Sequence, residues 1–121
     1  MENLDLACAK LGKQLAEIKG VEEKLLTEAL SVLEEQGLYA AFLFLEARGK
    51  KQGKDVSKRC ADFLRETPSI VPLLGKDDIW PALQKLAGDL DRLLFARDLL
   101  RQALIYGRYH VKERGDVGSE E

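Results

Sequence analysis

The residues that could perform nucleophilic or metal-assisted chemistry are few in this sequence and lie far apart. Its one histidine is His110, and its two cysteines are Cys8 and Cys60. A catalytic thiol needs a positioned base, and a zinc site needs several ligands at close spacing; the sequence offers neither pattern. We therefore interpret both cysteines as buried thiols and His110 as a structural or surface residue. We expect no catalytic residue, no metal ion, no cofactor and no enzymatic activity. A hydrolase would require a cysteine or a pocket carboxylate with a perturbed pKa.

Basic side chains are the most distinctive chemical feature, because they gather in the middle of the chain. Residues 37–112 carry 14 basic and 9 acidic side chains, whereas residues 1–36 and 113–121 are net acidic. Two groups of these basic residues have spacings that could place each group along one helix face. The first row combines Lys50 and Lys51 of a lysine-rich segment with Lys54, Lys58 and Arg65, which share one face of the helix that follows it. The second row consists of Arg97, Arg101, Arg108 and Lys112.

Rows of this kind suit binding to a nucleic-acid backbone without reading its sequence, because lysine and arginine neutralise phosphates. No motif for reading bases accompanies them, such as paired aromatic residues on a sheet or a recognition helix. Binding would therefore be weak for each copy and would strengthen when several copies line up along one strand. A solvated helix face beside a flexible loop is the alternative interpretation, and the sequence leaves both open.

The composition favours one all-α domain. The chain has 121 residues, of which 45% are hydrophobic, and this is enough for a single core. Leu, Ala, Glu and Lys are abundant, while β-branched residues are scarce. Residues 38–45 form an unbroken apolar run, which we interpret as a helix over 37–48 at the centre of a compact bundle.

We expect five to six helices around this central one, ending with a long C-terminal helix. Their predicted ranges are 3–18, 21–36, 37–48, 54–66, 79–87 and 89–113, within a domain of residues 1–114. Asn3 and Asp78 are expected N-caps, and Gly37 is an expected C-cap in the left-handed region. Gly107 would permit a close helix contact. We interpret residues 49–54 as a loop and residues 115–121 as a disordered acidic tail.

The connection over residues 67–78 is unusually apolar for a segment that contains Pro68, Pro72 and Gly75. It includes Ile70, Val71, Leu73 and Leu74, which should not lie in water together. Either these side chains cover one end of the bundle or they form a contact with another subunit. Trp80, just after the connection, is expected to anchor the next helix to the core.

We expect a cytoplasmic protein that does not associate with a membrane. Charged residues at positions 2, 5, 10 and 13 interrupt any apolar core of a signal peptide. In addition, no apolar run approaches the roughly 20 residues that cross a bilayer.

Two segments of the chain resemble a known family. The first is residues 35–45, Glu-Gln-Gly-Leu-Tyr-Ala-Ala-Phe-Leu-Phe-Leu, in which Gly-Leu begins an apolar helix that a Lys-rich segment follows. The second is Gln102-Ala103-Leu104 with Tyr109 and Lys112 downstream. Both are similar to the small helical subunit of type III-B CRISPR effector complexes, the Cmr small subunit. The order of the helices, the chain length and the long last helix agree as well.

This resemblance implies an all-helical, non-catalytic protein that takes part in antiviral defence. In that family, copies associate with one another as a filament inside a ribonucleoprotein, beside the guide RNA and its target RNA. The implied partners are the other subunits of the complex, both RNAs and further copies of the chain. From the charge pattern, the two basic rows are our candidates for RNA contact, and Ile70, Val71, Leu73 and Leu74 are our candidates for subunit contact. The alternative is a helical protein-interaction module without a role in nucleic-acid binding.

Overall fold

Six helices and no strand make up the part of the chain that the structure, a computed structural model, describes. It describes the backbone of residues 2–119 and the side chains of residues 2–115. The helices are α1 (Leu4–Ala16), α2 (Glu23–Gln36), α3 (Leu38–Arg48), α4 (Lys50–Glu66), α5 (Ile79–Ala87) and α6 (Leu90–Ser119). The predicted all-α class, with a long last helix, is therefore confirmed.

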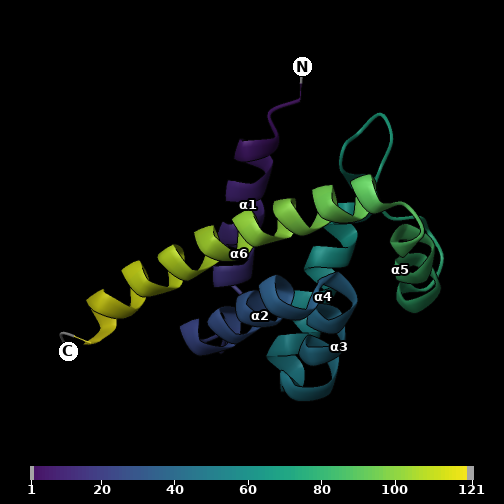
Figure 1. The fold of residues 1–121 in the computed structure, drawn as a ribbon. Helices are drawn as coiled ribbons and strands as arrows, with labels where there is room; N and C mark the ends of the chain where they lie inside the picture. The colour runs from purple at the N-terminus through teal and green to yellow at the C-terminus, as the bar shows by residue number, and fades with distance from the viewer. Residues whose placement is uncertain (1, 120–121) are drawn as a thin grey trace.

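The longest helix, α6, spans the molecule and packs against α1, α2, α3 and α5 (Figure 1). Its contact with α1 is the most extensive, and the two helices cross steeply (Figure 1). Small residues lie at the crossing: a Cβ atom added to Gly12 would lie 2.5 Å from Tyr106 Cβ and 2.8 Å from both Ala103 O and Gly107 N. The backbones can approach this closely only because Gly12 and Gly107 lack side chains, as predicted for Gly107.

Polar contacts between the same two helices add to the apolar packing. The Cys8 thiol donates to Leu99 O at 3.4 Å, and the Tyr106 hydroxyl donates to Asp5 Oδ1 at 2.8 Å. The Asp5 carboxylate raises the pKa of Tyr106 because it accepts this hydrogen bond only from the protonated phenol. At the start of α1, Asn3 accepts from Leu6 N at 3.0 Å and is the N-cap that the sequence predicts.

The apolar helix α3 lies at one edge of the molecule rather than at its centre. Its Phe42 and Leu45 are buried, but Leu43 is 50% exposed and Tyr39 is 41% exposed. The expectation of a helix covered on all sides therefore differs from the structure. The reason is that α2 and α4 pack on α3 from two sides and leave the groove beside α2 open.

The segment that we predicted as a loop, residues 49–54, is a tight turn followed by helix. Gly49 is the single residue between α3 and α4, and α4 begins at Lys50, four residues earlier than predicted. Gly53 makes this possible, since a Cβ atom there would collide with Leu45 O. Its N–H donates to Gly49 O at 2.7 Å. The φ angle of Lys50 is +55°, which is uncommon for a residue with a side chain.

Other boundaries differ from the predictions by smaller amounts. Gly37 ends α2 with φ +105° and ψ −176°, a conformation favoured by glycine but outside the left-handed helical region. Asp78 makes no side-chain capping bond to α5, whereas Asp89 caps α6 by accepting from Arg92 N at 3.2 Å. The helix α6 continues to Ser119, so residues 115–119 of the predicted tail are helical. Residues 120–121 lie outside the described part.

Candidate nucleic-acid interface

Neither cysteine is arranged for catalysis. Both are buried, as predicted. Burial raises the pKa of the Cys60 thiol to about 12, and burial together with the Asp5 carboxylate raises that of Cys8 to about 11, so both are protonated near neutral pH. His110 lies beside Glu113, with 4.0 Å between Nδ1 and Oε2. Within the described residues, no three His, Cys, Asp or Glu side chains form a group that could hold a metal ion.

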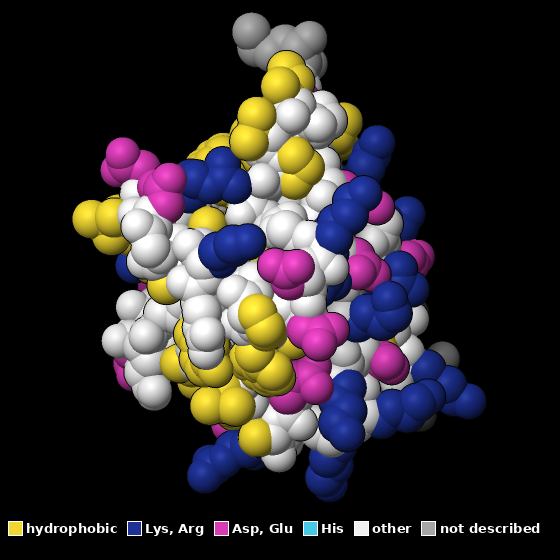
Figure 2. All heavy atoms as spheres, turned by 90° about the vertical axis from the view of Figure 1, so that its right-hand side faces the viewer, with side chains coloured by type: hydrophobic (Ala, Val, Ile, Leu, Met, Phe, Trp, Pro, Cys, Tyr) yellow, Lys and Arg dark blue, Asp and Glu magenta, His cyan; other side chains and the backbone are white. Residues whose placement is uncertain are grey.

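Basic side chains are spread over more than one part of the surface. Figure 2 shows Lys and Arg side chains along the right-hand edge, at the bottom and in the upper left part of the face seen from the right of Figure 1, with Asp and Glu side chains among them. Apolar side chains gather in the lower half of the same face. The nine candidate residues therefore have to be considered by their neighbours, which divide them into three groups. Three residues have no carboxylate partner among the described side chains, four lie beside a carboxylate, and the last two line a small pocket.

The first group is the turn between α3 and α4, where Lys50, Lys51 and Lys54 are exposed. Arg48 at the end of α3 is also exposed, and no acidic residue occurs between Glu46 and Asp55. Among the described side chains, no carboxylate is within ion-pair distance of these four basic groups. We call Arg48, Lys50, Lys51 and Lys54 the basic turn.

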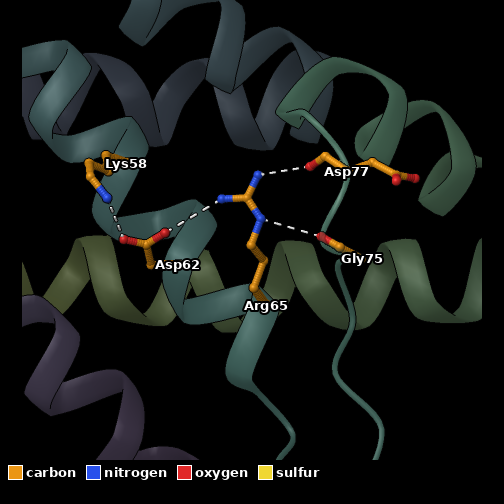
Figure 3. Close-up of polar contacts among 5 residues, drawn as sticks. All are labelled: Lys58, Asp62, Arg65, Gly75 and Asp77. Carbon is orange, nitrogen blue, oxygen red and sulfur yellow. Dashed lines mark hydrogen bonds and ion pairs between the residues drawn. The ribbon is translucent and has the colours of Figure 1, made fainter.

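The remaining two residues of the first row, Lys58 and Arg65, have partners within the chain (Figure 3). Lys58 Nζ lies 3.0 Å from Asp62 Oδ2. Arg65 Nη1 lies 3.5 Å from the other oxygen of Asp62, while Nε donates to Gly75 O at 3.3 Å and Nη2 to Asp77 O at 3.1 Å. Arg65 thus holds the connection between α4 and α5 in place. These bonds occupy the guanidinium group that we predict from the sequence to contact RNA.

The second row follows the side of α6 that adjoins α2, where acidic residues lie close to it. Arg101 Nε is 3.8 Å from Glu34 Oε2 of α2, and Arg97 Nη2 is 3.9 Å from the neighbouring Asp98. All four side chains are at least 40% exposed, so each ion pair contributes only about 0–1 kcal/mol to stability. These pairs nevertheless reduce the positive potential of this part of the row.

Arg108 and Lys112 form a third group, farther along α6. They line a small pocket of about 100 Å³ with Glu23, Ile105 and Tyr109. Arg108 Nε is buried and has no hydrogen-bond partner among the described residues. A buried donor without a partner costs about 1–3 kcal/mol, so an acceptor that reaches Arg108 Nε would be stabilising.

The first turn of α2 lies between the basic turn and this pocket. Its Lys24 shares a hollow of about 290 Å³ with Arg48 and Lys50, and its Glu23 lines the pocket of Arg108. Parts of both predicted rows therefore flank one helix terminus, although Glu22 and Glu28 also line the hollow. Sequence reasoning missed Lys24 and Arg48. Arg48 adjoins the first row in sequence and could have been included, whereas only the fold brings Lys24 near.

The four predicted subunit-contact residues divide into two pairs. Leu73 and Leu74 are 5% and 2% exposed and cover one end of the core, so they are not accessible to another subunit. In contrast, Ile70 is 91% exposed and Val71 is 58% exposed. Trp80 packs on the core, as predicted, and against Tyr39 with ring centroids 5.3 Å apart.

Comparisons of this chain with protein-family models, with curated proteins and with solved structures found no match. Over the described residues, no helix combines the length and the apolar character that crossing a membrane requires.

Proposed function

We propose that this protein is a non-catalytic small subunit of a type III CRISPR effector complex, of the type III-B kind. In this role it holds the backbone of guide or target RNA by charge, associates with further copies of itself and acts in antiviral defence in the cytoplasm. The resemblance of residues 35–45 and of residues 102–112 to the Cmr small subunit supports this proposal. The six-helix fold with its long last helix is compatible with it.

The observation that carries the RNA-binding part is the basic turn. Four exposed cations lie where α3 ends and α4 begins, without a carboxylate partner among the described side chains. A helical backbone loses less conformational entropy on binding than a flexible lysine loop. Charges that no carboxylate offsets are those that release counterions when a phosphate backbone binds.

The position of these lysines also favours an anionic partner. Lys50 and Lys51 lie in the first turn of α4 and Lys54 follows one turn later, while that first turn contains no acidic residue. A helix N-terminus carries a partial positive charge, so cations placed there are destabilising by about 0.3–1 kcal/mol each at an exposed site. Phosphate oxygens near the turn would be attracted both by the lysines and by the helix N-terminus, and this attraction would offset the repulsion.

The test is a titration of the purified chain with fluorescent single-stranded RNA over a range of salt concentrations. We expect the logarithm of the affinity to fall with the logarithm of the salt concentration, with a slope of about −0.7 per neutralised phosphate. Lys50→Glu, Lys51→Glu and Lys54→Glu together should abolish binding, and circular dichroism should show the helix content unchanged. Lys10→Glu, Lys76→Glu and Lys85→Glu change the net charge equally at exposed sites elsewhere and should leave most binding intact. Equal binding by the two triple variants would refute the basic turn as the RNA site.

The pocket of Arg108 and Lys112 gives a second measurement on the same RNA. If the strand continues past the first turn of α2, Arg108→Glu with Lys112→Glu, in a chain whose basic turn is intact, should make the dependence of RNA affinity on salt less steep than in wild type. Arg101→Glu should change it less, because Glu34 already offsets that charge.

A protein-interaction module without nucleic-acid binding is the second candidate. The exposure of Ile70 and Val71 favours it, since exposed aliphatic side chains gathered at one point mark contact sites. It predicts association of the chain that is insensitive to salt and no RNA affinity in the titration above.

A further inference from the structure

Three partly buried arginine side chains differ in what their guanidinium groups bind. Arg65 and Arg92 each donate to two backbone carbonyl groups of the connection between α4 and α5. Arg108 is also partly buried, yet among the described residues it has no hydrogen-bond or ion-pair partner, and its Nε atom is enclosed. Enclosed donors in a folded protein normally have an acceptor, so Arg108 points to one that the chain itself does not supply.

The pocket beside Arg108 is formed by one side of α6 and the first turn of α2. Ile105, Arg108, Tyr109 and Lys112 occupy positions i, i+3, i+4 and i+7, which share one side of a helix. Glu23, the first residue of α2, lines the pocket from the other helix. In Figure 1 the C-terminal half of α6 runs past this end of α2. Two cations and one carboxylate therefore surround the same small volume.

The charged groups of this pocket do not neutralise one another. Among the described side chains, Glu23 forms no ion pair with Arg108 or Lys112, although all three line the pocket. The pocket volume of about 100 Å³ compares with about 30 Å³ for one water molecule in the liquid. It is well below the roughly 300–1,000 Å³ of sites for drug-sized ligands. The pocket therefore has room for one small oxyanion and not for a nucleotide.

The N-terminus of α2 adds positive potential to that of the two cations. Asn3 caps α1 and Asp89 caps α6 through side-chain hydrogen bonds, whereas Glu22 makes no such bond to α2. The first N–H groups of α2 thus keep their partial positive charge on the side where Glu23 lines the pocket.

We propose that this pocket binds inorganic phosphate. Arg108 and Lys112 offset the charge of the ion, and the guanidinium group can do so through paired hydrogen bonds. Near neutral pH, inorganic phosphate still carries at least one proton, so one of its hydroxyl groups donates to the Glu23 carboxylate. An anion without such a proton meets Glu23 only as a like charge. The carboxylate in the pocket is therefore the group that selects the ligand.

This selection separates inorganic phosphate from related anions. Sulfate has the same shape but carries no proton near neutral pH, and neither does a phosphodiester of an RNA backbone. A phosphate monoester loses its last proton with a pKa of about 6. The inference thus goes beyond the proposed function, because its ligand is a free ion whose binding does not require the RNA contacts of the basic turn.

The first measurement is calorimetric titration of the purified wild-type chain at neutral pH, with the ionic strength held constant by sodium chloride. Inorganic phosphate should bind about tenfold or more tightly than sulfate or dimethyl phosphate, because neither of these ions can donate to Glu23. Dimethyl phosphate represents the RNA backbone in this comparison.

Variants of the two cations test where phosphate binds. Arg108→Gln should weaken phosphate binding by about tenfold or more, as expected for the loss of hydrogen bonds between charged groups. Lys112→Gln should weaken it several-fold, and this exposed position keeps the test valid if Arg108→Gln disturbs the fold. Arg101→Gln is the matched control, since Arg101 lies on α6 outside the pocket and beside Glu34. This variant should bind phosphate as wild type does.

Glu23→Gln separates a selective site from a general attraction of anions. The amide group can donate to sulfate, so the preference for phosphate over sulfate should disappear in this variant. The inference would be overturned if wild type binds no phosphate, as it would if Glu23 pairs with Arg108 in solution. It would also be overturned if wild type binds sulfate as tightly as phosphate, or if both cation variants bind phosphate as wild type does. None of these outcomes decides whether the basic turn binds RNA.

Discussion

At the α1–α6 crossing and at the α3–α4 turn, helix backbones touch at glycines, but the two contacts leave different surroundings. At the crossing, Gly12 meets Ala103 and Gly107, and buried Leu15 and Leu26 surround them. At the turn, Gly53 meets Leu45 O, and exposed cations lie on the residues on both sides. A close backbone contact at glycine thus lies inside the apolar core at the crossing, whereas at the turn it lies beside exposed lysine and arginine side chains.

The difference indicates which of the two contacts was shaped by packing alone. The side-chain contacts of the crossing stabilise the fold: they are buried apolar side chains and the Tyr106–Asp5 hydrogen bond. The turn contains features that oppose stability, namely Lys50 with a φ of +55° and lysines at the positive end of a helix. Unfavourable local features that persist in a well-packed fold are typical of binding sites.

The largest effect should come from filling the glycine contacts. Gly12→Ala and Gly53→Ala each place a methyl group against backbone atoms, which cannot move aside as a side chain can. We expect each to lower the free energy of unfolding by about 3 kcal/mol or more, beyond the usual cost of overpacking. Chemical denaturation would measure this.

Gly115→Ala is the matched control for this pair of variants. A Cβ atom at Gly115 meets nothing within 4 Å, and the residue lies within α6. Alanine there should leave stability unchanged or raise it by up to about 1 kcal/mol, the difference in helix propensity. Wild-type stability of Gly12→Ala or Gly53→Ala would show that the corresponding helix pair is farther apart than described.

Helical periodicity predicted most of the fold, because each amphipathic helix carries its own apolar stripe. It failed where a boundary depends on two helices touching. Nothing local to residues 49–54 indicates that Gly53 must fit against Leu45 O, so glycine and lysine together resembled a loop. In the same way, an apolar run predicts a buried helix, and only the packed structure shows that Leu43 faces an open groove.

The sequence predicted which basic residues could bind RNA, but not which of them lie together on one surface without a partner in the fold. Spacing placed Arg97 and Arg101 on one side of α6, yet their acidic neighbours depend on local side-chain placement and on how α2 packs. Arg65 shows the same limit, because its carbonyl partners lie 10 and 12 residues away in an irregular segment. Charge pattern alone cannot separate a cation that holds the fold from one that is available to a ligand.

A second prediction uses the buried thiols, one at the crossing and one on the inner face of α4. The pKa of Cys60 is raised from 9.0 to about 12, so above pH 9 the unfolded chain loses this proton while the folded chain keeps it. The stabilisation is fully present below pH 9 and is lost as the pH rises toward 12, at about 1.4 kcal/mol per pH unit.

Cys60→Ala should remove this pH dependence. Between pH 9 and 10.5, the difference in free energy of unfolding between wild type and variant should change by about 2 kcal/mol, in the direction that favours the variant. Urea denaturation at several pH values measures it, and groups common to both proteins cancel. Cys8→Ala should act similarly over a shorter range, since the pKa of Cys8 is raised only to about 11. If the difference in free energy of unfolding between wild type and variant does not vary with pH, water reaches the Cys60 thiol in the folded chain and the pKa of this thiol is not raised.

The smallest effect tests whether the basic turn opposes stability. Lys51→Glu places an anion in the first turn of α4, where the helix dipole favours it, and should raise the free energy of unfolding by about 0.3–1 kcal/mol. The same change should weaken RNA binding, so stability and affinity move in opposite directions. Lys10→Glu, an exposed reversal in the middle of α1, should change neither by a comparable amount. A Lys51→Glu variant that loses stability would remove the electrostatic contrast between the turn and the crossing, because the lysine would then be part of the packing that holds α4 in place.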